Sequence, residues 1–442
     1  MAFKRPPFFS GQAPALDSLA FRLAGAAEAT RLVCAGRSLP DALVVACQTL
    51  KTDNSSRAAI QDIAYNTMRK LGTARFLTNS LVKKSIETDI VKYLLFCALS
   101  LLIPDGSVPR YSPFTVVNQA VTAANTIRHA QKAKGLINAV LRNYLRTQQV
   151  LLEKVASNEE AKWNYPQWWI DNVKTHYPNQ WQSILEAGNQ TPPLTLRVNT
   201  RRISPEDYLK HLQKAHIGAD IIGPYAVRLA SPIPVDRIPG FQEGLVSVQD
   251  KAAQLAAPLL GLKDGMQVLD ACAAPGGKSA HMLELADIAL TALDSGEKRL
   301  SMIHENLDRL GLHARVLHGD ATQSDWWDGT LYDCILADVP CSASGVTRRH
   351  PDIRWLRKPE DAQQLAVYAK SILDNLWGKL KPGGKLLLAT CSIWPEESEE
   401  QAVFFAFKPD AHRLDASGQL LPSFNGLNDH DGLFYALFRK SI

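Results

Sequence analysis

Cysteine pairs, membrane-length apolar runs and dinucleotide-type glycine patterns are all missing from this 442-residue sequence. Its seven cysteines include no Cys-x-x-Cys pair, which argues against a zinc site, and their odd number argues against a disulfide framework. The longest apolar run, Tyr93–Ile103, is too short to span a bilayer. The amino-terminal stretch 1–9 is broken by prolines and shows no targeting pattern. We therefore predict a cytoplasmic protein with no metal site and no membrane span.

Acidic residues are absent from positions 106–152, although the net charge of the whole chain is only +5. The basic residues of the same stretch are Arg110, Arg128, Lys132, Lys134, Arg142 and Arg146. Such a cationic segment in an otherwise balanced chain indicates a polyanion partner, and a solvated helix face is the alternative explanation. The predicted nucleic-acid contacts among these residues are Arg128, Lys132, Lys134 and Arg142.

The chain is long enough for two or three domains, each with its own core. Ala- and Leu-rich segments at helical spacing predict helices over 15–34, 39–50, 57–71 and 73–82. Aromatic residues then crowd between Trp163 and Trp181, where they could stack on bases or form a hydrophobic hinge. We predict an all-α domain over 10–150, a small α+β connecting module over 151–243 and an α/β domain over 244–442.

Strands alternate with helices from residue 244 onward, which predicts a parallel sheet covered by helices on both faces. The predicted strands are 266–272, 289–294, 314–320, 332–339 and 385–391. The predicted helices are 277–286, 297–310, 361–380 and 396–407. Lys381-Pro382-Gly383-Gly384 is expected to end the third of these helices. A closing antiparallel pair is expected to be formed by the regions of Phe424 and Leu433–Phe438.

A glycine loop follows the first predicted strand of the α/β domain. It consists of Cys272, Ala273, Ala274, Pro275, Gly276, Gly277 and Lys278. It matches neither Gly-x-Gly-x-x-Gly nor the Walker pattern, but its place between a strand and a helix is typical of a nucleotide-like cofactor site. Asp294, Asp320 and Asp338 end the next three predicted strands and are the expected acidic ligands of that cofactor. Helix capping is the alternative explanation for Asp294.

Two cysteines directly follow two predicted strands, Cys341 in Asp338-Val339-Pro340-Cys341-Ser342 and Cys391 in Ala389-Thr390-Cys391-Ser392. A thiolate that adds to carbon 6 of a cytosine makes carbon 5 nucleophilic enough to attack an electrophilic methyl group. Loss of the carbon-5 proton and expulsion of the thiolate restore the ring, and Asp338 is the predicted acid near N3. The residues therefore indicate cytosine methylation, but this chemistry leaves open which thiol attacks. Core packing is the alternative explanation for either cysteine alone.

An arginine-rich loop lies between the two thiols and contains Arg348, Arg349 and Arg354. Guanidinium groups bind phosphates, and an enzyme that acts on a base takes the nucleotide out of its stack. We predict that these three arginines contact RNA.

Four segments resemble the RNA cytosine-5 methyltransferase family. They are 270–278 (DACAAPGGK), 338–342 (DVPCS), 348–352 (RRHPD) and 389–392 (ATCS). The segments Val117–Val121 and Ile137–Arg142 resemble the NusB-like RNA-binding domain found in part of this family. Phe241, Gly244 and Val248–Asp250 match the segment that leads into the catalytic domain. Within the family, the chain is most similar to the bacterial enzymes that act on small-subunit ribosomal RNA.

The resemblance implies a Rossmann-like class I methyltransferase domain behind an all-α NusB-like domain. It implies that S-adenosylmethionine binds at Cys272–Lys278, Asp294, Asp320 and Asp338. It also implies that Cys391 is the nucleophile and that Cys341 assists product release. Ser295 stands near the place where the family often has a second acidic residue after the ribose-binding aspartate. The expected substrate is a cytosine of 16S ribosomal RNA, and nothing in the sequence indicates more than a monomer.

Three alternative functions can be weighed against this one. A transfer RNA could replace ribosomal RNA as the substrate, although the NusB-like segments argue against it. A non-enzymatic RNA-binding factor could use the α/β domain only as a scaffold, and failure to bind S-adenosylmethionine would favour that hypothesis. Amine methylation normally requires Asn or Asp with Pro-Pro and an aromatic residue, whereas this chain has Val339-Pro340-Cys341.

Overall fold

Two separately packed units make up the chain in the computed structural model, which describes residues 8–83, 85–106 and 108–442. One unit extends to Asn189 and includes His350–Arg357, and the other comprises Gln190–Arg349 and Lys358–Ile442. Most of the stretch 1–9, which is predicted to carry no targeting signal, lies outside the described residues. No helix within the described ranges is long and apolar enough to cross a membrane. The predicted boundaries near 150 and 243 stay predictions.

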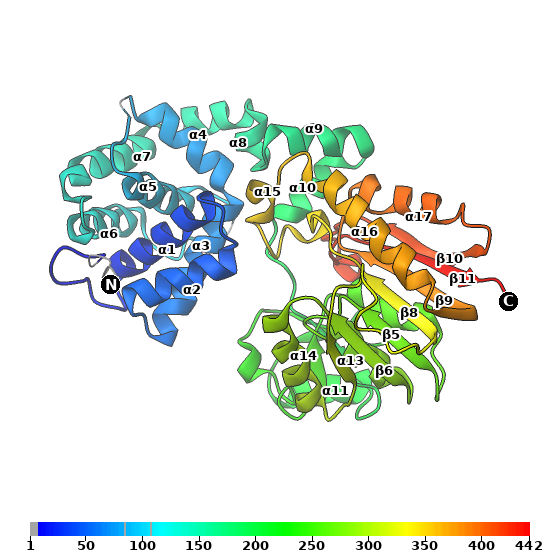
Figure 1. Cartoon of the computed structure of the whole chain (residues 1–442). Helices are drawn as coiled ribbons and strands as arrows, with labels where there is room; N and C mark the ends of the chain where they lie inside the picture. Colours follow the sequence, from blue (N-terminus) through cyan, green and yellow to red (C-terminus); the bar gives the residue numbers. More distant parts are fainter. Residues whose placement is uncertain (1–7, 84, 107) are drawn as a thin grey trace, which may run out of the picture. The chain divides into compact units, whose positions relative to one another are not determined.

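The first unit is all-α. Its helices are α1 (Leu19–Cys34), α2 (Leu39–Leu50), α3 (Asn54–Arg69), α4 (Leu71–Leu81), α5 (Asp89–Leu102), α6 (Pro113–Thr126), α7 (Lys134–Ala156), α8 (Glu159–Trp163), α9 (Gln167–His176) and α10 (Trp181–Asn189). Helix α1 is buried along nearly its whole length and packs against α2, α3, α5 and α6 (Figure 1). The predicted bounds of Leu39–Leu50 are confirmed. Asp53 caps α3 by accepting a hydrogen bond from the Ser56 N–H at 2.7 Å.

The crowded aromatic residues pack on one another in α8, α9 and α10. The rings of Trp163 and Trp181 meet edge to face with their centres 5.2 Å apart. Trp163, Tyr165 and Trp169 are buried. These three rings form protein contacts within the first unit, so their place in the structure favours packing over base stacking.

The second unit begins with a small antiparallel sheet. Its strands are β1 (Thr195–Val198), β2 (Ala219–Ile221), β3 (Ala226–Leu229) and β4 (Val246–Val248), in the order β2-β3-β1-β4. Helix α11 (Pro205–Lys214) packs against β2 and β3, and Tyr208 and Leu212 bury its apolar side. The small sheet and α11 form an α+β arrangement that follows the helical unit in the chain.

A seven-stranded sheet forms the rest of this unit. Its strands are β5 (Gln267–Ala271), β6 (Ala289–Asp294), β7 (Arg315–His318), β8 (Tyr332–Asp338), β9 (Leu380–Thr390), β10 (Ala411–Leu420) and β11 (Leu433–Lys440). The order is β10-β11-β9-β8-β5-β6-β7, and the five strands β5 to β9 are parallel. This confirms the predicted α/β architecture with a largely parallel sheet.

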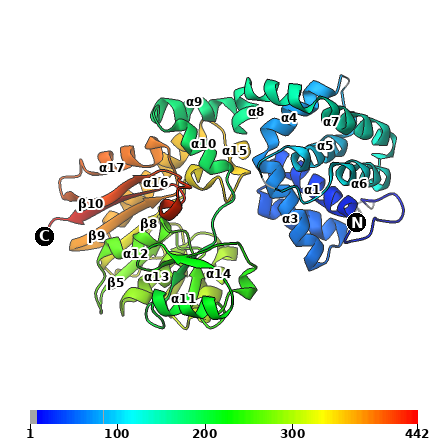
Figure 2. The same cartoon turned by 180° about the vertical axis from the view of Figure 1, so that it is seen from behind.

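Helices cover both faces of the large sheet because successive strand residues point to opposite sides. On one face, Leu269, Ile335 and Leu388 pack with α16 (Asp361–Trp377) and α17 (Glu399–Phe405). On the other, Val268 and Leu336 pack with α12 (Ala256–Leu260), α13 (Gly277–Leu285) and α14 (Glu297–Leu310). Figure 1 shows α16 beside β9 and α17 beside β10, and Figure 2 shows α12 and α13 from behind. Two apolar layers therefore hold the sheet edge that carries the site.

Three predictions for the carboxyl-terminal region are wrong. Helix α16 ends at Trp377, before Lys381–Gly384, and those residues belong to β9 because the chain already extends from Leu380 beside β8. Strand β11 pairs with β10 and β9 rather than with the region of Phe424. The expected helix 396–407 is a short 3-10 turn followed by α17, since Ser398 between them has a non-helical backbone.

The close contact between α4 and α8 predicts that Gly72→Ala destabilises the helical unit. A Cβ at Gly72 would lie 2.3 Å from the Glu160 carbonyl oxygen, so the backbone of α4 or of α8 must move to make room. We expect the free energy of unfolding to fall by about 2 kcal/mol. Circular dichroism at 222 nm should show a lower unfolding temperature. Gly135→Ala in α7 is the matched control, because its Cβ would meet nothing within 4 Å. An unchanged unfolding temperature for Gly72→Ala would contradict this packing.

Candidate functional site

The parallel register brings the predicted site residues to one edge of the large sheet. Strand β5 pairs with β6 and β8, and β8 pairs with β9, so their carboxyl ends form a single row. Cys272, Asp294 and Asp338 lie at the ends of β5, β6 and β8, and Cys391 directly follows β9. Asp320 follows β7 by two residues. Ligands of open parallel sheets bind at this edge.

The glycine loop makes a tight turn between β5 and α13. The Ala273 N–H donates to the Leu293 carbonyl at 2.9 Å, which fixes the start of the loop against β6. Gly276 has a φ of +91°, and a Cβ there would lie 3.2 Å from Cα of Ile303. Glycine therefore lets the loop pack directly on α14. Burial raises the pKa of the Cys272 thiol, so this cysteine stays neutral and serves as a packed loop residue.

Carboxylates surround this loop. Asp294 is 1% exposed and accepts hydrogen bonds from the Ala274 N–H at 3.0 Å and from the Gly296 N–H at 2.8 Å. Asp320 accepts from the Thr322 N–H at 2.9 Å, and this bond is the main cause that lowers the pKa of Asp320. Both side chains are therefore held as acceptors at the ends of their strands.

Lys278 and Asp338 form an ion pair beside the loop. The Lys278 Nζ lies 2.5 Å from the Asp338 Oδ2. Burial disfavours the Lys278 ammonium, but the Asp338 carboxylate more than compensates, so the pKa of Lys278 lies above its ordinary value. The Cys391 sulfur is a smaller cause of the same raised pKa.

The two predicted thiols meet. The Cys341 Sγ and the Cys391 Sγ are 3.4 Å apart, although 50 residues separate them in the chain. Their hydrogen bond, burial and the charge of Glu397 hold the pKa of Cys341 well above its ordinary range. Cys341 is therefore protonated at neutral pH and can donate to the Cys391 sulfur. The structure thus brings both candidate thiols into direct contact at the sheet edge.

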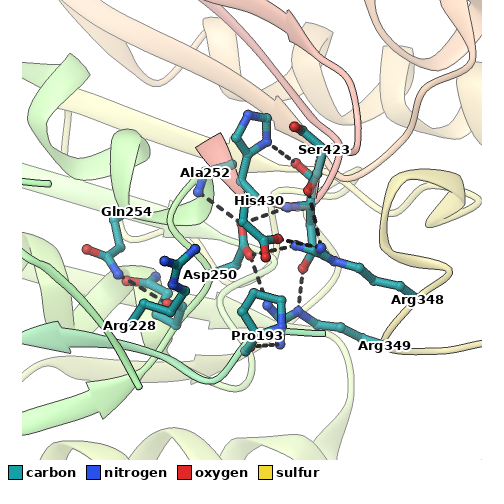
Figure 3. Close-up of polar contacts among 12 residues, drawn as sticks. Pro193, Arg228, Asp250, Ala252, Gln254, Arg348, Arg349, Ser423 and His430 are labelled. Carbon is teal, nitrogen blue, oxygen red and sulfur yellow. Dashed lines mark hydrogen bonds and ion pairs between the residues drawn. The ribbon is translucent and has the colours of Figure 1, made fainter. Parts of the chain in front are cut away.

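Arg348 and Arg349 lie in a cluster of ion pairs (Figure 3). The Arg348 side chain is 1% exposed, and it donates to Asp431 through Nε and to Asp429 through Nη1, each at 2.6 Å. Arg349 donates to Asp250 through Nη2 at 2.9 Å and also pairs with Asp431. The cluster joins the loop after Cys341 to the chain before α12 and to the chain before β11. The Arg348 guanidinium, expected to hold a phosphate, neutralises protein carboxylates here.

Arg354 is also buried, in α15 (Ile353–Leu356), which packs with the helical unit. Its Nη2 donates to the Gly188 carbonyl at 2.6 Å, and its Nη1 donates to the Asn189 Oδ1 at 2.5 Å. Its guanidinium carbon lies 3.9 Å from the centre of the Tyr165 ring. In this structure Arg354 therefore anchors residues 350–357 to α10, and it presents no exposed surface to a phosphate.

The remaining predicted RNA contacts lie on or next to α7. Arg128, Lys132 and Lys134 fall between the end of α6 and the first residue of α7, and Arg142 lies on α7. Lys132, Lys134 and Arg142 are exposed, and Arg128 is half-buried. These four residues stay predicted nucleic-acid contacts.

Sequence reasoning missed two buried charged residues beside the site, Arg197 and Glu397. Arg197 interrupts an apolar strand-like run. Because a charge in a buried strand requires a partner, the sequence could have predicted a buried ion pair at Arg197. Glu397 is one of four glutamates in the stretch 396–400 (EESEE), and nothing in the sequence distinguishes it from the other three.

Arg197 ties the small sheet to the cofactor loop. It is 1% exposed on β1, and its Nε and Nη2 donate to the two carboxylate oxygens of Glu284 at 2.8 and 2.7 Å. Its Nη1 donates to the Gly277 carbonyl and to the Gln249 Oε1, each at 2.7 Å. Because Gly277 opens α13, the guanidinium fixes the helix start that follows the loop.

Three family profiles match successive parts of the chain. The NusB family matches residues 27–146, a ferredoxin-like domain of RsmF/B-like methyltransferases matches 165–236, and the 16S rRNA methyltransferase RsmB/F family matches 257–439. "Ribosomal RNA small subunit methyltransferase B" of Vibrio vulnificus is 41% identical over 431 residues, which cover 95% of this chain and 99% of that protein. The chain belongs to the ribosomal RNA small subunit methyltransferase B family. The protein of the same name from Proteus mirabilis is 41% identical over 394 residues, 88% of this chain and 91% of its own.

Solved structures share the fold. The structure titled "Crystal Structure of PH0851" aligns with a TM-score of 0.76 and 22% identity, and it covers 97% of this chain and 100% of its own. A methyltransferase homolog from Pyrococcus horikoshii aligns with a TM-score of 0.55 and 27% identity, and it covers 64% of this chain and 97% of its own. Family membership and this architecture confirm the predicted NusB-like domain and Rossmann-like methyltransferase fold.

The chain is therefore an S-adenosylmethionine-dependent methyltransferase with RNA as its partner. Membership of a methyltransferase family argues against the alternative that the chain is a non-enzymatic RNA-binding factor. The residues at the sheet edge fit the cofactor, since Asp294 and Asp320 offer acceptors for hydroxyl and amino groups and α13 begins at the loop. No group of three or more His, Cys, Asp or Glu side chains in the described ranges could hold a metal ion.

The contacts of Arg197 predict that it supports cofactor binding as well as stability. Arg197→Met should destabilise the protein by about 3–5 kcal/mol, because it leaves the buried Glu284 carboxylate without its partner. The double variant Arg197→Met/Glu284→Met should recover most of that loss, since apolar side chains often replace a buried ion pair well. The double variant still lacks the guanidinium that donates to the Gly277 carbonyl. We therefore expect S-adenosylmethionine to bind on the order of tenfold more weakly, as measured by calorimetry. Wild-type affinity in the stable double variant would show that Arg197 acts on stability alone.

Proposed function

We propose that this enzyme methylates carbon 5 of a cytosine in 16S ribosomal RNA through a covalent bond between Cys391 and carbon 6. The observation that carries the proposal is the 3.4 Å contact between the Cys341 and Cys391 sulfurs, next to the Lys278–Asp338 pair. The names of the relatives support the choice of RNA. We also propose that the enzyme acts in the cytoplasm, where this RNA is made, and that it works as a monomer.

Each side chain at the sheet edge has a role in this proposal. The Cys391 thiolate adds to carbon 6, and charge moves through the ring toward carbon 5 and N3. The ion pair of Lys278 and Asp338 supplies the proton at N3: the proton comes from the Lys278 ammonium, and the Asp338 carboxylate relays it. Before that transfer, the ammonium also stabilises the negative charge that develops on the ring. After carbon 5 carries the new methyl group, a base takes the carbon-5 proton and the carbon–sulfur bond breaks. The protonated Cys341 donates a hydrogen bond to the departing Cys391 sulfur.

We propose that Cys272–Lys278, Asp294, Asp320 and Asp338 hold the cofactor. Bound S-adenosylmethionine supplies an electrophilic methyl group on a sulfonium sulfur. The loop backbone and the start of α13 offer N–H donors, and the carboxylates accept from hydroxyl and amino groups. The exposed Lys132, Lys134 and Arg142 are the proposed phosphate contacts of the helical unit, together with Arg128.

The proposed chemistry predicts different phenotypes for the two cysteines. Cys391→Ala should lose methylation, because no thiolate remains to activate carbon 5. Cys341→Ala should accumulate a covalent enzyme–RNA adduct, seen as a shifted band under denaturing conditions. Cys334→Ala in the interior of β8 is the control and should keep activity. Full activity of Cys391→Ala would refute the assigned nucleophile.

Mapping of 5-methylcytosine distinguishes ribosomal from transfer RNA. We expect bisulfite sequencing of total RNA from a strain without this protein to show the loss of a methylated position in 16S RNA. Re-expression of the wild-type protein should restore it, and Cys391→Ala should not. A loss confined to transfer RNA would overturn the proposed substrate.

A further inference from the structure

One buried carboxylate contacts both segments that follow the catalytic thiols. Glu397 lies in the 3-10 turn Pro395–Glu397, and it is 1% exposed. Its Oε1 accepts from the Ser342 N–H at 2.6 Å. Its Oε2 accepts from the hydroxyls of Ser342 and Ser392, each at 2.5 Å. Because Ser342 follows Cys341 and Ser392 follows Cys391, Glu397 bridges the loop after β8 and the turn after β9.

Further hydrogen bonds join the same two segments. The hydroxyls of Ser344 and Ser392 lie 3.0 Å apart, and the Ser344 hydroxyl accepts from the Ile393 N–H at 2.9 Å. The Gly345 N–H donates to the Cys391 carbonyl at 2.8 Å. A Cβ at Gly345 would lie 2.2 Å from the Gly432 carbonyl oxygen, so this approach requires glycine. The carboxylate of Glu397 is the charged centre of this network.

A charged acceptor strengthens such a network. Hydrogen bonds to an ionised carboxylate are about twice as strong as neutral ones, and a low local dielectric strengthens them further. Glu397 therefore resists the separation of the two loops more than a neutral side chain would. The charge of Glu397 also contributes to the raised pKa of Cys341. Glu397 thus affects both the distance between the two thiols and the protonation of Cys341.

We propose that Glu397 is a positioning residue that holds the Cys341 and Cys391 sulfurs at the separation that the reaction requires. This inference rests on the proposed function, in which Cys391 bonds to the base and Cys341 assists its release. Glu397 acts through the serine that follows each cysteine.

Glu397→Gln tests the proposal because it keeps the shape and removes the charge. The amide offers one acceptor oxygen in place of two, so at least one bond to Ser342 or Ser392 weakens. We expect kcat to fall on the order of 10²-fold, the effect of a misplacement of about 1 Å, while KM for RNA and S-adenosylmethionine affinity change little. Glu400→Gln is the matched control, since Glu400 is exposed in the first turn of α17.

A second measurement reports the thiol distance without any RNA. Diamide oxidises the Cys341–Cys391 pair to a disulfide and is itself reduced to the hydrazine, and peptide mass spectrometry measures the rate. We expect disulfide formation to be several-fold slower in Glu397→Gln and unchanged in Glu400→Gln. If Glu397→Gln does not fold, Ser342→Ala/Ser392→Ala replaces it, because this variant removes both hydroxyl bonds and leaves the carboxylate.

The outcomes separate this proposal from the proposed function. A wild-type kcat together with a wild-type diamide rate in Glu397→Gln would overturn the positioning role. So would a parallel loss of kcat, RNA affinity, cofactor affinity and unfolding temperature, which marks a general structural defect. If Cys391→Ala stays active, the covalent chemistry is wrong, and the diamide rates alone decide whether Glu397 holds the thiols together.

Discussion

The parallel pairing of β8 with β9 is the constraint on which the site depends. Two adjacent parallel strands end at the same sheet edge, so the residues that follow them are neighbours whatever their distance in sequence. Cys341 and Cys391 meet for this reason. Two apolar layers, one on each face of the sheet, fix the register, because a shift by one residue would turn every buried side chain to the wrong face.

Buried charges then set the positions of the loops beyond this edge. Arg197 reaches α13 from the small sheet, and Arg348 and Arg349 join the loop after Cys341 to Asp250 and Asp431. These charges are removed from water, so each needs a close partner of opposite sign. The loops beside the site therefore have few alternative arrangements, which is the pre-organisation that catalysis requires.

The arginines between the thiols show how a motif can serve architecture. Guanidinium groups near a nucleic-acid site suggest phosphate contacts, but Arg348 and Arg354 are buried and bonded to protein groups. Residues 350–357 pack with the helical unit while the chain on either side of them belongs to the catalytic unit. The segment that begins at Cys341 is therefore covalently continuous with an anchor in the helical unit.

Local periodicity or a short motif was enough to predict the α/β alternation, the glycine loop, the acidic strand ends and both thiols. The bounds of Ala289–Asp294 and Glu297–Leu310 were predictable for the same reason. The folded chain was needed to show the pairing of β10 with β11, the ion partners of Arg348 and the bridging position of Glu397. Those features depend on contacts between residues far apart in the chain, and no local pattern specifies which buried charges meet.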